Sequence, residues 1–86
     1  MNNNVVFVSN AVIDISVPIA SFPIHSGKHQ STVDQVVITP GGNATTLFCG
    51  ARLGLQMTAL GNLGNDPMGS LWTSSLTVEG VDVSQM

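Results

Sequence analysis

An α/β fold built around a largely parallel sheet is the architecture that this 86-residue sequence predicts. A short run of β-branched and aromatic residues at 5–8 has the composition of a strand covered on both faces. A β-rich stretch then ends in the glycine pair Gly41-Gly42, and a helical pattern follows it. A second helical pattern begins at Asp66 and gives way to a strand entry at 81–86. This alternation is typical of βα units around a parallel sheet.

The first half of the chain predicts two strands separated by a long loop. Residues 5–8 predict a central strand, and Asp14 lies just beyond it among apolar neighbours. Residues 17–30 contain two prolines and a glycine and show no sustained helical period, which indicates a loop with irregular strand. Residues 31–39 are rich in β-formers and predict a second strand, which Pro40 ends.

The second half predicts two helices with a strand between them. Residues 43–53 predict a helix that stops at Gly54, and residues 57–63 predict the strand. Asp66 and Pro67 predict a helix start, because the carboxylate can accept from first-turn amides and proline suits the first helical position. Four apolar side chains follow at helical spacing and are expected to face the core: Met68, Leu71, Trp72 and Leu76.

Composition limits the kinds of partner that this chain can have. Hydrophobic residues make up 43% and charged residues only 8%, against roughly 25% charged in an ordinary domain, so much of the surface is expected to be covered by a partner or by more protein. The net charge is -3, and the sequence has only one lysine and one arginine. These residues cannot form the basic patch that nucleic-acid binding requires. No apolar run approaches the roughly 18 residues of a membrane span, and no basic leader is present, so we expect a cytoplasmic protein away from membranes.

The single cysteine and the two histidines are expected to have no special chemistry. Cys49 has no partner for an intrachain disulfide and lies in an apolar run, which predicts a buried, inert thiol. His25 and His29 have the i, i+4 spacing that holds a metal on a helix. Pro23 and Gly27 argue against a helix there, so solvated loop histidines and no metal site are expected.

Asp14 and the glycine pair are the candidate binding residues. Asp14 is the only carboxylate among the first thirty residues, and ligands of open α/β sheets sit beyond the carboxyl ends of strands. It is therefore a candidate for binding substrate hydroxyls, while a turn or capping aspartate satisfied by local amides is an equally open interpretation. Gly41 and Gly42 lack a Cβ, so their backbone can approach a ligand closely.

Three motifs in order carry a family resemblance. The stretch VVFVSNAVIDIS leads from a strand to Asp14, with Ser9 where the family has a glycine. PGGNATTLFCGARLG is similar to a GG-x-x-x-N helix ending in ARLG, and GNLGNDPMG contains a G-x-D-x-x-G pattern at Gly64, Asp66 and Gly69. The set resembles the N-terminal part of the ribokinase-like (PfkB) carbohydrate kinases over nearly all 86 residues. The resemblance implies a ribokinase-like, Rossmann-type layered sheet with a small β lid.

The resemblance implies the N-terminal, sugar-binding part of an ATP-dependent carbohydrate or nucleoside kinase, which phosphorylates a sugar hydroxyl. The family's motif asparagine falls at Thr46 when counted from the glycines, or at Thr45 when counted back from ARLG. Residues 17–39 would form the lid over the sugar and mediate homodimer contacts. Carried over position by position, the substrate-binding residues are Asp14, Gly41, Gly42, Asn43 and Thr46. Asp66 is assigned to structure, as a helix cap.

The catalytic part of the family pattern does not occur in these residues. Relatives carry a late G-A-G-D motif with the catalytic base and the anion hole, and no such motif is found here. ATP and Mg²⁺ are therefore implied only for a full-length family member, no catalytic residue or metal ligand is assigned, and the 86 residues alone are expected to be inactive. The alternative is a truncated, non-catalytic kinase-like module that binds a sugar or a partner subunit.

Overall fold

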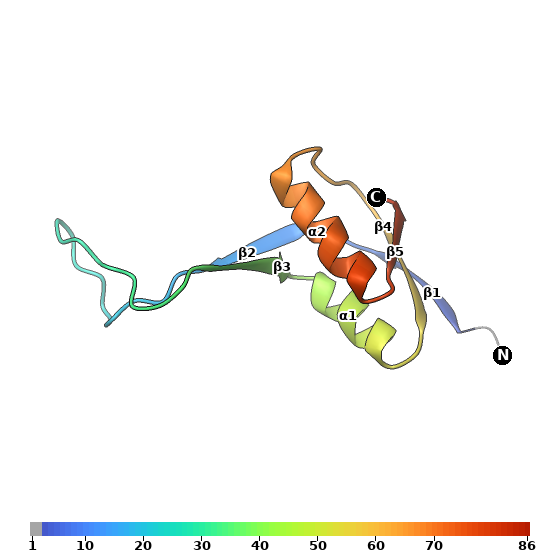
Figure 1. The fold of residues 1–86 in the computed structure, drawn as a ribbon, viewed down its shortest axis with the longest axis horizontal. Helices are drawn as coiled ribbons and strands as arrows, with labels where there is room; N and C mark the ends of the chain where they lie inside the picture. The colour runs from blue at the N-terminus through green and yellow to red at the C-terminus, as the bar shows by residue number, and fades with distance from the viewer. Residues whose placement is uncertain (1–2) are drawn as a thin grey trace.

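The computed structural model describes residues 3–86, which form five strands and two helices (Figure 1). In chain order these elements are β1 (Asn4–Val8), β2 (Val12–Ser16), β3 (Val37–Gly41), α1 (Ala44–Arg52), β4 (Gln56–Leu60), α2 (Pro67–Val78) and β5 (Asp82–Gln85). They make one three-stranded parallel sheet and one two-stranded antiparallel sheet. The predicted α/β class is confirmed.

The parallel sheet has the order β1-β4-β5, so β4 is its central strand. The prediction that residues 5–8 form the central strand is wrong for the part of the chain that the structure describes. The apolar run was expected to be covered on both faces, but Val6 is 64% exposed and Val8 is 73% exposed, so β1 is covered on one face only. Local composition could not show that β1 lies at the edge of the described sheet, because the position of a strand in a sheet depends on the βα connections that follow it.

Both helices cover the same face of this sheet. Met57 and Ala59 alternate along β4 and are buried, as a strand's period of two requires for residues on one face. The residues paired with them in β1, Val5 and Phe7, pack against the same core. That core joins both helices to the sheet through Ala44, Leu47, Met57, Ala59, Trp72, Leu76 and Val81.

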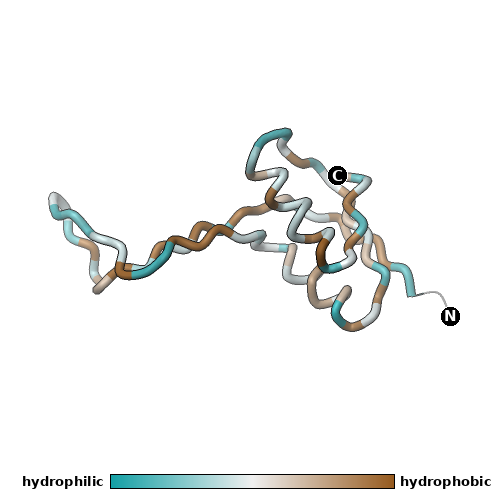
Figure 2. The backbone as a smooth tube through the Cα atoms, in the orientation of Figure 1, coloured by the Kyte–Doolittle hydropathy of each residue, from teal (hydrophilic) through white to brown (hydrophobic). Residues whose placement is uncertain are grey.

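The antiparallel hairpin of β2 and β3 extends away from this body. Its register runs from Val12 opposite Gly41 to Ser16 opposite Val37, and the loop of residues 17–36 closes its far end (Figure 1). The Cα radius of gyration is 16.4 Å, whereas about 12 Å is expected for a compact chain of this length. The predicted lid therefore projects into solvent, and Figure 2 shows that its stem is largely hydrophobic.

Several strands differ from the prediction. The second strand was expected at 31–39, but β3 begins at Val37 and continues through the first glycine of the pair. Only the isolated bridge between Ile19 and Thr32 pairs part of the preceding stretch. Asp14 was expected in a connection just beyond the first strand, but it lies in the middle of β2, a strand that was not predicted. The strand expected at 57–63 is β4, which ends at Leu60. A β-rich composition makes a strand only where a partner strand supplies hydrogen bonds.

The helix boundaries follow the predicted signals closely. The Asp66 carboxylate accepts a hydrogen bond of 2.8 Å from the Gly69 amide, and Pro67 occupies the first turn of α2, which confirms the predicted cap. After α1 the chain turns at Gly54, whose φ is 89°. The longest helix in the described range has 12 residues, and no described helix is long and apolar enough to cross a bilayer.

Three side chains expected inside lie outside the core or only partly within it: Met68 and Cys49 are exposed, and Leu71 is half-buried. Trp72 and Leu76 are fully buried, but Met68 is 42% exposed because it lies at the start of α2, beyond the end of the sheet's core. Cys49 is also exposed, so the prediction of a buried thiol is wrong. The buried positions of α1 recur every three residues, and Cys49 falls between them on the outer side.

An ion pair joins the C-terminal ends of the two helices. Arg52 Nη2 lies 2.7 Å from Glu79 Oε1, and Arg52 Nε donates to Glu79 Oε2 at 3.0 Å. The hydrogen bonds from Arg52 lower the pKa of Glu79. A carboxyl whose folded pKa is depressed stabilises the fold above its unfolded pKa of about 4.3 and loses that contribution as the pH falls through the folded pKa.

We expect Glu79→Gln to flatten the acid limb of the stability profile. The wild type should lose more thermal stability than the variant between about pH 5 and pH 3, with a small difference because the pair is exposed. Thermal melting by circular dichroism at several pH values measures this. Asp34→Asn, which removes an exposed carboxylate from the loop of residues 17–36, is the control and should keep the wild-type slope. Parallel profiles for Glu79→Gln and the wild type would show that the pair does not contribute.

Candidate functional site

The register of the hairpin brings the candidate residues onto one of its faces. Directly paired residues in an antiparallel ladder share a face, and so do residues two apart in one strand. Asp14 pairs with Thr39, and Val12 pairs with Gly41, so all four lie on the same face of the stem. The opposite face carries Ile13, which packs against the core beneath α2.

Asp14 lies directly against the backbone of Gly41. A Cβ built on Gly41 would overlap the Asp14 carboxylate, so only glycine at this position lets the acid rest there. Asp14 is exposed, and within residues 3–86 its carboxylate makes no hydrogen bond or ion pair. The local amide bonds that a turn or capping aspartate would make are therefore not found in the described chain.

The chain turns from this face directly into α1. Gly42 has a φ of 55°, a backbone conformation that residues with a side chain rarely adopt. Asn43 is the N-cap residue of the helix. The Asn43 side chain makes no capping hydrogen bond. Its amide is exposed beside the glycine pair, where it can contact a ligand above Gly41 and Asp14.

Thr45 and Thr46 both lie exposed in the first turn of α1. Their backbone amides form the opening turn, with Thr45 N donating to Gly42 O at 3.3 Å and Thr46 N donating to Asn43 O at 3.1 Å. The buried face of the helix passes through Ala44 and Leu47. At 3.6 residues per turn, Thr46 lies at the flank of that face and Thr45 on the far side of the helix.

Sequence reasoning missed Thr39, which the structure places with Asp14 and Gly41 on one face of the hairpin, called the polar face below. Thr39 falls inside the segment 17–39 that we predicted as lid, but the structure places it in the hairpin stem, opposite Asp14. A signal for it exists, since Thr39 and Gly41 are two apart in one strand and therefore share a face. Its pairing with Asp14 depends on a register across 24 intervening residues, which no local pattern gives.

The loop of residues 17–36, which we predicted as part of a lid, carries the two histidines. His25 and His29 are both exposed. Among residues 3–86, no three His, Cys, Asp or Glu side chains come together in a way that could hold a metal ion.

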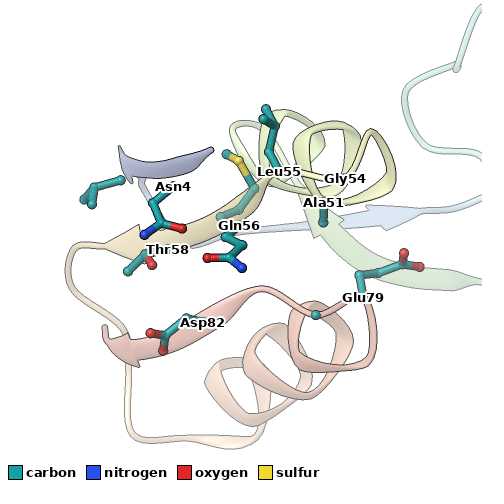
Figure 3. A pocket seen from close by; sticks show the side chains of 11 residues that line it. Asn4, Ala51, Gly54, Leu55, Gln56, Thr58, Glu79 and Asp82 are labelled. Carbon is teal, nitrogen blue, oxygen red and sulfur yellow. The ribbon is translucent and has the colours of Figure 1, made fainter. Parts of the chain in front are cut away.

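A cavity lies at the amino ends of the strands of the parallel sheet. It has a volume of about 720 Å³, and Figure 3 shows the side chains of Asn4, Gln56, Thr58 and Asp82 around it. Three of these residues begin β1, β4 and β5, so the cavity opens at the amino ends of the strands. Ligands of open α/β sheets bind beyond the carboxyl ends. The hairpin follows the carboxyl end of β1 at Val8, so its face with Asp14 is the better candidate.

Comparison with known proteins identifies the class to which this fold and site belong. The family model described as pfkB family carbohydrate kinase matches residues 2–86, and the chain belongs to that family. A search of curated proteins found no significant match.

A solved structure shares the whole fold. It is described as "Crystal structure of a putative ribokinase from Agrobacterium tumefaciens", and it is 25% identical with a TM-score of 0.76. The match covers 100% of this chain and 28% of that protein, so the chain spans less than a third of its structural relative. The predicted ribokinase-like fold is confirmed.

Proposed function

We propose that this chain is the sugar-binding part of an ATP-dependent carbohydrate or nucleoside kinase that phosphorylates a sugar hydroxyl. The observation that carries the proposal is the Asp14 carboxylate, which lies against Gly41, faces solvent and has no partner within the described residues. An ionised carboxylate can accept from two adjacent hydroxyls of a polyol, and each charge-assisted bond contributes about 1.5 to 3 kcal/mol.

The neighbouring groups would complete the sugar site. Gly41 and Gly42 are the proposed backbone contacts. The space where a Cβ of Gly41 would stand holds the Asp14 carboxylate and that of Gly42 holds Val12, so the glycines would meet the sugar through their backbone polar groups. Asn43 offers an uncommitted amide that can both donate and accept. Thr46 is the proposed further contact, with Thr45 as its alternative.

ATP and Mg²⁺ are the cofactors that the family implies, and the described residues do not fit them. Phosphoryl transfer requires metal ligands and cations placed around the phosphates. Residues 3–86 supply no metal-binding cluster, and of the two cations in the sequence Arg52 is engaged by Glu79. We therefore assign no catalytic step to this chain. A kinase-like module that binds a sugar or a partner subunit without phosphorylating a sugar is the second candidate.

A sugar panel tests the proposal. Isotope-labelled chain is titrated with pentoses, hexoses and nucleosides, and NMR shift changes are recorded. We expect at least one ligand to shift the signals of Asp14, Gly41 and Gly42, and we expect no ADP release from ATP with the chain alone. The lack of any shift across the panel would overturn the sugar-binding proposal, and ADP release would overturn the second candidate.

We also propose that the lid serves as a homodimer contact. Apolar side chains are exposed along its length, including Phe22 at 81%, Val33 at 61% and Ile24 at 60%. Burying such groups between two copies would remove them from water, which is the main favourable contribution to association. Light scattering after gel filtration should show a dimer that Phe22→Ser weakens. A monomer at all concentrations would contradict this assignment.

A further inference from the structure

The polar face of the hairpin presents a hydroxyl beside the candidate carboxylate. We infer that Thr39 is a second contact for substrate hydroxyls and a determinant of which sugar binds. The inference rests on the proposed function and adds a residue that neither the family motifs nor the sequence pattern assigned.

The ladder fixes where Thr39 lies. It is directly opposite Asp14, and Cβ atoms of such pairs are about 4.5 to 5.5 Å apart on one face of the sheet. Both side chains are exposed, and within residues 3–86 the Thr39 hydroxyl has no hydrogen-bond partner. Five paired positions hold the two strands together, so the spacing of hydroxyl and carboxylate is set by the backbone.

The two groups complement each other chemically. An ionised carboxylate can only accept, so a sugar hydroxyl that contacts Asp14 must donate its proton and keeps lone pairs free. The Thr39 hydroxyl can donate to such a lone pair or accept from the next hydroxyl along the ring. A carboxylate with a hydroxyl beside it therefore matches a polyol better than a carboxylate alone.

This pairing would give selectivity as well as affinity. A sugar that lacks the hydroxyl facing Thr39 leaves that group without its partner when the ligand covers it, and unpaired polar groups are disfavoured in a closed site. The lid loop is the segment that could provide this cover, since it continues from both strands of the hairpin (Figure 1). The identity of the accepted sugar would then depend partly on Thr39.

Three variants of the full 86-residue chain test the inference. Thr39→Val keeps the branched shape without the hydroxyl and suits a strand, so folding is expected to be retained. Thr39→Ser keeps the hydroxyl. Ile38→Val is the matched control, since it lies on the same strand but on the opposite face of the hairpin. Circular dichroism checks that all three keep the wild-type fold.

Dissociation constants are measured by NMR titration with the panel sugar that binds the wild type and with its monodeoxy analogues. We expect Thr39→Val to weaken binding of the parent sugar about 3- to 10-fold, and Thr39→Ser and Ile38→Val to change it less than about 2-fold. One monodeoxy analogue should bind the wild type and Thr39→Val equally, which identifies the hydroxyl that Thr39 contacts.

Two outcomes would overturn the inference while leaving the proposed function intact. The first is an unchanged dissociation constant in Thr39→Val. The second is an equal loss for the parent sugar and for every monodeoxy analogue, which would show an indirect effect. A wild-type chain that binds no panel sugar would instead overturn the proposed function, and this inference with it.

Discussion

Asp14→Ala should weaken sugar binding by at least about 100-fold. The variant loses two charge-assisted hydrogen bonds of about 1.5 to 3 kcal/mol each, and every 1.4 kcal/mol corresponds to a factor of ten. Asp14→Asn keeps the shape but replaces the charged acceptor by an amide, so we expect a loss of about 30-fold or more. Isothermal titration with the best sugar of the panel measures both effects.

A lid acid provides the matched control for this experiment. Asp34 is also exposed, but its carboxylate accepts from the Gln35 amide at 2.7 Å, as a turn aspartate does. Asp34→Asn changes the net charge by the same amount as Asp14→Asn, and we expect it to leave the dissociation constant unchanged. Equal affinity of the wild type and Asp14→Ala would remove Asp14 from the site, whereas equal losses at both positions would indicate a general charge effect.

The helices were the most predictable part of the fold because their signals are local. The cap of α2 involves Asp66, Pro67 and the amide of the residue three positions after Asp66. All of these groups lie within four consecutive residues, so the sequence alone is enough to predict the cap. The stop of α1 at Gly54 is equally local. Such elements can be predicted without knowing what packs against them.

The strands were less predictable because each depends on a partner distant in the sequence. Residues 31–36 have the composition of a strand but lack a ladder, whereas β3 begins only where β2 supplies one. The position of β1 at the edge of the described sheet depends on where β4 inserts, fifty residues later in the chain. Cys49 was misplaced for a related reason, since an apolar run does not show which side of a helix meets the sheet.

The candidate site combines both kinds of information. Asp14 and the glycine pair could be found from motifs because each lies in a short, ordered pattern. The structure adds that Asp14 rests against Gly41, which is a contact across the two strands of the hairpin. Thr39 could not be found, because its relation to Asp14 exists only in the register. The assignment of these residues to a sugar stays a prediction for the experiments above.

Trp72→Ala should unfold most of the protein at 25 °C. Trp72 is fully buried at the centre of the core that joins α2 to the sheet, and truncating a buried Trp costs about 3 to 5 kcal/mol. A domain of this length has a net stability of only about 4 to 13 kcal/mol, and a small core lies toward the lower end of that range. Far-UV circular dichroism and urea titration measure the loss, and Met68→Ala, at an exposed position of the same helix, is the control.

Trp72→Phe separates packing from hydrogen bonding at the same position. The Trp72 indole Nε1 is buried and has no hydrogen-bond partner among residues 3–86, so removing its N–H sacrifices no bond and relieves an unsatisfied donor. The phenyl ring keeps most of the apolar volume, and we expect a folded variant that loses at most about half as much stability as Trp72→Ala. Equal losses for the two variants would contradict this expectation. A Trp72→Ala variant as stable as Met68→Ala would show that the core does not depend on this side chain.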